Sequence, residues 1–165
     1  MEQLRRYLNH SKIDVVFKQN KDDFVVTEVP LYEFSGEGEH LVLKIRKKDL
    51  ATWDAIELLA KFLNCNSREF GYAGLKDKNA MTVQSISIHR KYEEKLKSYQ
   101  NENLRILEMT YHNNKIKVGH LKGNKFFIRL KRVGSIEKRK IEEALGSIVT
   151  NGIPNYFGFQ RFGID

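Results

Sequence analysis

Short runs of β-branched and aromatic residues, separated by polar turns, constrain the fold of this chain more than any other feature of its sequence. In the run "NKFFIRLKR", Phe126 and Ile128 alternate with Phe127 and Arg129, as in a strand. Helical spacing of apolar residues is expected at 53–63, in a short segment near 92–98 and after Ser135. Strands that outnumber helices and follow one another predict an α+β fold, with a mainly antiparallel sheet and flanking helices. The expected strands are 13–19, 23–29, 41–46, both sides of the loop within 70–88, 104–112, 115–121 and 124–132.

Polar segments indicate how these elements are joined. "SGEGEH" has the composition of a turn, and we expect a hairpin between the strands before and after it. "NNK" is expected to join the next pair of strands. Thr52 and Ser135 are predicted N-caps of the two longer helices, and Gly152 lies near the end of the second.

The charge balance indicates an anionic partner. The chain has 165 residues, the length of one domain, with 29 Lys and Arg against 21 Asp and Glu, a formal net charge of +8. Basic clusters interleaved with aromatic residues favour nucleic acid, because a cationic surface releases counterions from a phosphate backbone. No apolar run approaches the roughly 18–20 residues that cross a bilayer, so no membrane association is expected. A single cysteine, Cys65, excludes an internal disulfide and predicts a cytoplasmic protein.

The sequence lacks the residue patterns of several classes of enzyme chemistry. The five histidines and one cysteine have no metal-ligand spacing, and the sequence has no H-E-x-x-H, P-loop or dinucleotide fingerprint. We therefore expect no metal and no organic cofactor.

The stretch "FGYAGLKDKNAMTVQSISI" places one carboxylate, Asp77, between Lys76 and Lys78 in a short polar loop. Taken alone, "KDKN" is typical of an ordinary exposed turn. A carboxylate in a basic chain can also attack carbon or stabilise a cationic sugar, as acidic residues do in glycosidases. Flanking cations would favour its ionised form and offset its repulsion of RNA phosphates.

The stretch closely resembles the catalytic loop of the TruD family of tRNA pseudouridine synthases, whose pattern runs approximately AG-x-KD-x-x-A-x-T-x-Q. That family continues beyond "NYFGFQRFG" through an inserted domain before completing its catalytic sheet. The resemblance thus implies that 1–165 is the N-terminal part of a pseudouridine synthase catalytic domain, without the inserted domain and the C-terminal part. A sheet left incomplete would expose an edge, and we expect reduced stability or self-association. Four other blocks resemble the family in the same order: "DFVVTEVP", "GEGEHLVLKIRKK", "IKVGHLKGNKFFIRL" and "GIPNYFGFQRFG".

The resemblance implies an isomerase that converts uridine 13 in the D arm of tRNA to pseudouridine, with Asp77 as the catalytic residue. Phe126 would stack on the flipped uracil, although its strand position also fits a core residue. Asn124 would bond a base edge or hold the Asp77 loop, and Gln84 would either hold that loop or point outward. The remaining substrate-binding candidates are Lys18, Lys76, Lys78 and Arg161.

A second hypothesis is a non-catalytic RNA-binding module, or an inactive fragment. The basic and aromatic residues suit both hypotheses, because stacking and charge alone bind RNA. Asp77 separates them: a synthase needs its carboxylate, and a binding module does not.

Overall fold

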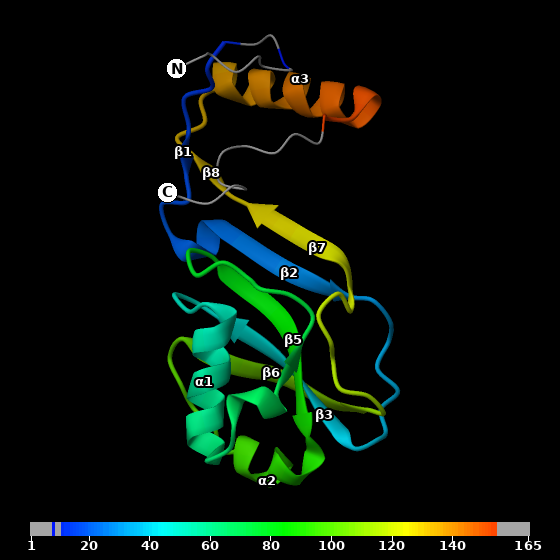
Figure 1. Cartoon of the computed structure of the whole chain (residues 1–165). Helices are drawn as coiled ribbons and strands as arrows, with labels where there is room; N and C mark the ends of the chain where they lie inside the picture. Colours follow the sequence, from blue (N-terminus) through cyan, green and yellow to red (C-terminus); the bar gives the residue numbers. More distant parts are fainter. Residues whose placement is uncertain (1–7, 9–10, 155–165) are drawn as a thin grey trace, which may run out of the picture. The chain divides into compact units, whose positions relative to one another are not determined.

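The computed structural model describes residue 8 and residues 11–154, and the chain divides into two compact units (Figure 1). One unit comprises Lys18–Arg129, and the other comprises Met1–Phe17 with Leu130–Asp165. The single domain expected from length stays a prediction. In the smaller unit, the strands near its two ends pair with each other: β1 (Val16–Phe17) is antiparallel to β8 (Leu130–Lys131) in a separate two-stranded sheet.

The larger unit is built on a mixed sheet whose main path runs β6-β3-β5-β2-β7. β2 and β5 are parallel, and all other pairs are antiparallel, so the predicted α+β fold with a mainly antiparallel sheet is confirmed. β7 and β6 are the two ends of this path. The strands are β2 (Phe24–Pro30), β3 (His40–Lys47), β5 (Met81–His89), β6 (Leu104–His112) and β7 (Leu121–Ile128), and the short β4 (Gly71–Tyr72) also pairs with β5.

Two of the expected connections are wrong. β5 lies between β2 and β3, so these strands form no hairpin, and "NNK" is not followed by the strand expected over 115–121. Gly38 shows why the first turn leads elsewhere. At a φ of +120°, it runs so close to β6 that an added Cβ would lie 2.5 Å from the His112 carbonyl oxygen. Gly36 N–H also donates to Tyr111 O at 3.1 Å, which directs the turn toward β6. The residues 115–120, expected as part of a strand, are irregular, with a turn at Val118 and Gly119.

Helix α1 (Thr52–Leu63) covers one face of the sheet and encloses its core (Figure 1). Its N-cap is Ala51 rather than the predicted Thr52, because Asp54 accepts the Ala51 N–H at 2.8 Å and the Thr52 hydroxyl bonds elsewhere. Alternation along β3 and β5 directs Leu43, Ile45 and Ile86 toward this helix. The short helices of the unit are η1 (Lys21–Asp23), η2 (Ser67–Glu69), η3 (Arg90–Tyr92) and α2 (Glu93–Leu96).

The smaller unit carries helix α3 (Ser135–Asn151), which ends at Gly152 as expected. Its N-cap is Gly134, so the predicted cap Ser135 is instead the first helical residue. No residue of α3 is buried, and its apolar residues Leu145 and Val149 are more than half exposed. Within residues 11–154, no helix is long and apolar enough to cross a bilayer.

Candidate active site

Asp77 lies in the loop that connects β4 to β5, as the sequence predicted for its strand, loop, strand pattern. Ala73 at the start of the loop and Ala80 at its end are buried, whereas Asp77, Lys78 and Asn79 are exposed. The loop therefore has fixed ends and presents one carboxylate to solvent. Such a group can meet a substrate without first leaving the interior.

Lys47, the last residue of β3, holds the main chain at Asp77. Its side chain is fully buried, and its Nζ donates to Lys76 O at 3.2 Å, to Asp77 O at 3.1 Å and to Leu50 O at 2.6 Å. An ammonium group has three protons, so all of its donors are used. Burial lowers the pKa of Lys47 to about 8, and the nearby negative charge of Asp77 opposes this shift.

A second set of bonds holds the same loop from α1 and β5. Thr52 Oγ1 accepts the Lys76 N–H at 2.9 Å and donates to Gln84 Oε1 at 3.0 Å. Gln84 Nε2 in turn donates to Gly74 O at 3.5 Å. Gln84 is buried, so of the two expectations for it, the geometry is that of the side chain that holds the loop.

Lys76 points into the unit, where its Nζ pairs with Glu28 Oε2 at 2.7 Å. Both side chains are almost inaccessible, at 6% and 1% exposure. The predicted RNA contact by Lys76 stays a prediction, and in this structure its buried ammonium group is bonded to a carboxylate instead. The negative charge of Asp77 acts on Lys47, whose pKa it raises against the effect of burial.

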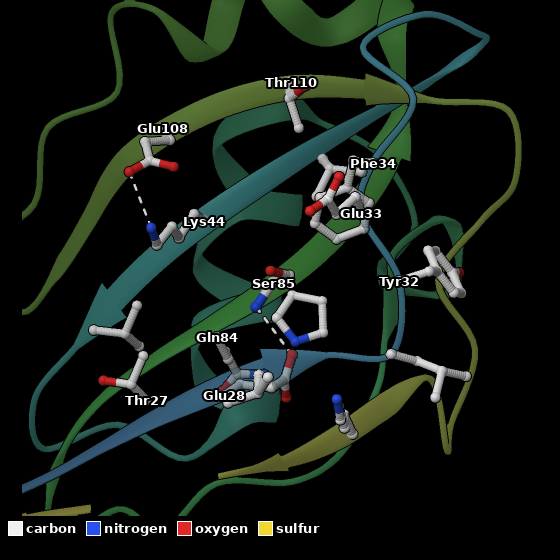
Figure 2. A pocket seen from close by; sticks show the side chains of 16 residues that line it. Thr27, Glu28, Tyr32, Glu33, Phe34, Lys44, Gln84, Ser85, Glu108 and Thr110 are labelled. Atoms are coloured by element: carbon white, nitrogen blue, oxygen red, sulfur yellow. Dashed lines mark hydrogen bonds and ion pairs between the residues drawn. The ribbon is translucent and has the colours of Figure 1, made fainter. Parts of the chain in front are cut away.

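Glu28 also closes the gap between β2 and β5. The parallel ladder ends at the pair Thr27 and Val83, and Glu28 Oε1 then accepts the Ser85 N–H at 3.2 Å (Figure 2). A hydrogen bond to a side chain thus takes the place of the next main-chain hydrogen bond of the ladder. A cavity of about 690 Å³ adjoins this point, lined by residues that include Thr27, Tyr32, Phe34, Lys44, Ser85 and Glu108.

The other expected base contacts lie on β7. Phe126 is 60% exposed, and its ring stacks with Phe24 at 6.0 Å between centroids. It is therefore no core residue of this unit. Lys18 Nζ lies 3.9 Å from the centroid of that same Phe24 ring. Asn124, two residues before Phe126 on the same face of the strand, is exposed as well.

Strand register places the side chains of Phe126 and Lys47 on the same face of the sheet. Phe126 is opposite Val26, Val26 is opposite Thr82, and Thr82 is opposite Lys47. Three strand spacings separate the ends of this row, about 14 Å. Phe126 and Lys47 thus stand at the two ends of one transverse row of side chains, and Lys47 bonds the main chain of Asp77.

The remaining predicted contacts are Lys78, which does not belong to this row, and Arg161. Asn79 Oδ1 accepts from Lys21 Nζ at 3.1 Å, and Lys21 also pairs with Asp49 at 2.8 Å. Lys78 is exposed beside Asp77. Arg161 lies outside the described residues.

Comparison with known proteins decides the family. The model of tRNA pseudouridine synthase D (TruD) matches residues 3–165. The chain belongs to the TruD family. A tRNA pseudouridine synthase D of Sulfurimonas denitrificans is 58% identical over 158 residues, which are 96% of this chain and 44% of that protein. One of Campylobacter jejuni is 52% identical over 156 residues, 94% of this chain and 42% of that protein.

Solved structures agree with this TruD assignment. The crystal structure of a TruD from Methanosarcina mazei matches 94% of this chain and 36% of its own, with a TM-score of 0.82 and 26% identity. The chain thus spans less than half the length of the TruD relatives it matches. The expected TruD resemblance is confirmed for both sequence and fold.

Sequence reasoning missed the part that three residues play in holding the Asp77 loop. Lys47 and Thr52 bond its main chain, and Glu28 pairs with Lys76. Lys47 belongs to "KIRKK", which the sequence presents as a basic surface cluster. A signal was nevertheless present, because Lys47 follows Leu43 and Ile45 at intervals of two and so shares their buried face. No comparable signal distinguishes Glu28, since its partner lies 48 residues away.

Proposed function

We propose that the chain carries the catalytic centre of a tRNA pseudouridine synthase that acts on uridine 13, with Asp77 as its catalytic carboxylate. The observation that carries this proposal is the position of Asp77: its carboxylate is exposed while the main chain beneath it is bonded to buried Lys47. A group held in this way can be aimed at a substrate without reorganisation of the loop.

The proposed reaction balances without a co-reactant. Asp77 acts at C1′ of the ribose, where the bond to N1 of uracil breaks. The base turns, C5 bonds to C1′, C5 loses its proton to solvent and N1 gains one. The product is an isomer of the substrate, so neither a reductant nor an energy source is required.

Phe126 and Asn124 are proposed to bind the extruded base. A flipped uracil needs an aromatic face, and the exposed ring of Phe126 supplies one at the far end of the transverse row. Asn124, on the same face of β7, would bond the edge of the base. Lys18, Lys78 and Arg161 are proposed phosphate contacts.

Tritium release from tRNA labelled at C5 of uridine tests the proposal. We expect release by the parent and at least a thousandfold less by Asp77→Asn, with tRNA affinity retained. Asp49→Asn is the matched control, because it makes the same charge change at an exposed aspartate that pairs with Lys21 near the loop. Its activity should equal that of the parent.

The length of the relatives calls for a second form of the protein in this assay. This chain matches only 44% of the Sulfurimonas denitrificans protein, so the chain joined to the remainder of that relative is measured beside it. Release by the joined protein alone would show that the remainder is needed. Release by neither, with tRNA affinity intact, would overturn the synthase in favour of the RNA-binding module, whose exposed β7 aromatic residues suit single-stranded bases.

A further inference from the structure

Lys47 is an unusual residue for the core of this unit. It follows Leu43 and Ile45 on the face of β3 that packs against α1, and its side chain has no exposed surface. All three acceptors of its ammonium group are main-chain carbonyl oxygens rather than carboxylates. A positive charge is therefore buried with only partial negative charges as its hydrogen-bond acceptors.

Such an arrangement is a poor choice for stability. Removing an ammonium group from water costs several kcal/mol, which neutral acceptors offset only in part. A residue like its neighbour Ile45 would fill the same face at no such cost. The lowered pKa of Lys47 has the same physical origin, because burial disfavours the charged form. The structure thus has a lysine at a position where a hydrophobic residue would avoid this desolvation cost.

What the lysine provides is a connection between separate parts of the chain. Leu50 O belongs to the segment that enters α1, whereas Lys76 O and Asp77 O belong to the loop that carries the candidate catalytic carboxylate. One ammonium group thus fixes the main chain of Asp77 to the end of β3 and the beginning of α1. Its charge also faces Asp77, whose negative charge raises the pKa of Lys47 against the effect of burial.

We propose that Lys47 is the positioning residue for Asp77: its buried ammonium group holds the two carbonyl groups at 76 and 77 so that the Asp77 carboxylate projects at one fixed place. The inference rests on the proposed function of Asp77 and adds the residue that sets its geometry. Lys47 touches no substrate and acts only through the main chain of the loop. Displacement of a catalytic group by about 1 Å can cost a hundredfold in rate.

Lys47→Met tests this role, because it keeps an unbranched side chain of similar length and removes all three donors. Lys44→Met is the matched control: Lys44 lies on the same strand but is 42% exposed and paired with Glu108. The first measurement is amide hydrogen exchange in the 165-residue chain, read at the Lys76 N–H that Thr52 accepts. We expect exchange there to be at least tenfold faster in Lys47→Met, with the amide groups of α1 unchanged and Lys44→Met like the parent.

The second measurement separates positioning from binding. In whichever form releases tritium from labelled tRNA, Lys47→Met should lower kcat by about tenfold to a hundredfold and leave the tRNA dissociation constant within about twofold. If Lys47→Met does not fold, Lys47→Gln, which retains two donors, replaces it in both measurements.

Each outcome decides one of the two proposals. Unchanged exchange at Lys76 in Lys47→Met overturns the inference whatever the activity. An unchanged kcat with faster exchange also overturns it, as does a parallel loss of kcat and tRNA affinity, which would make Lys47 a general structural residue. Absence of tritium release from every parent form overturns the proposed function, and the catalytic part of the inference with it, while the exchange data still report whether Lys47 anchors the loop.

Discussion

The Asp77 loop and strand β7 carry the main candidate site residues, and the two regions are held in opposite ways. The loop is fixed from below by buried polar groups: Lys47, Thr52 and the pair of Lys76 with Glu28. β7 lies at the end of the sheet path and leaves Phe126, Phe127 and Ile128 each at least half exposed. The first region is held by hydrogen bonds, and the second presents apolar surface.

This difference matches what each region is proposed to do. A reacting carboxylate must be placed to within a fraction of an ångström, which directed hydrogen bonds achieve. A stacking surface needs area and an open approach, since stacking tolerates small displacements. The comparison predicts that substitutions beneath the loop change stability, whereas substitutions on β7 change RNA binding.

Glu28→Gln should produce the largest loss of stability. It leaves the ammonium group of Lys76 buried without a counter-charge, which costs about 3–5 kcal/mol in the free energy of unfolding. Glu108→Gln removes the partner of exposed Lys44 and should cost no more than about 1 kcal/mol. Urea unfolding of the two variants measures the difference, and equal losses would contradict the contrast between buried and exposed pairs.

Two threonines beneath the loop give a more selective test. Thr52→Val leaves the Lys76 N–H and Gln84 Oε1 without their partner, at a cost of about 1–3 kcal/mol in unfolding free energy. Thr82 is equally buried, but its hydroxyl group has no hydrogen-bond partner among the described residues. Thr82→Val should therefore be neutral or stabilising. Thermal unfolding of the two variants measures both effects. A large loss in Thr82→Val would mean that its hydroxyl group bonds within the loop after all.

The two neighbouring phenylalanines of β7 test the other region. Phe126→Ala should weaken binding of a uridine-containing RNA by about 1–3 kcal/mol, because it removes the proposed stacking ring. Phe127→Ala is the control, since Phe127 faces the opposite side of the strand and packs near the Arg129 guanidinium group. Fluorescence titration of both variants measures the affinities. Equal losses would assign the effect to general apolar surface rather than to one stacking site.

The pH dependence of stability gives the smallest expected effect. The pKa of Lys47 is about 8 in the folded chain and 10.5 in the unfolded chain, so the unfolded chain binds more protons between these values. Stability contributed by this group therefore rises with pH, by about 1 kcal/mol between pH 8 and 9. The parent should gain this amount relative to Lys47→Met in denaturant unfolding at the two pH values, while activity that depends on the ammonium group falls. A parallel pH response of the two proteins would contradict the burial of this charge.

Local patterns predicted local structure well. The spacing of Ile56, Leu59, Ala60 and Leu63 predicted α1, and all four are buried. The strand, loop, strand pattern around Asp77 was also confirmed, because apolar alternation and a polar loop are written in adjacent residues.

Pairings between distant segments could not be read in the same way. The sequence contains a turn at "SGEGEH", but nothing local states that β5 inserts between β2 and β3. The ends of the "KDKN" loop raise the same difficulty, because the environment of Lys76 is set by Glu28 on another strand. Whether Asp77, Asn124 and Phe126 act on RNA stays a prediction, as does self-association of the chain.

The parallel pairing of β2 with β5 has a consequence for how the protein folds as it is synthesised. Val25 pairs with Met81, and the opposite edge of β2 pairs with β7, which begins at Leu121. When "FVVTEVP" leaves the ribosome, neither of its sheet neighbours has been made. This apolar strand must wait for most of the larger unit before it can pair, and such non-local pairing is slow. Glu28 within this strand later pairs with Lys76. Until then its charge opposes premature association of nascent chains.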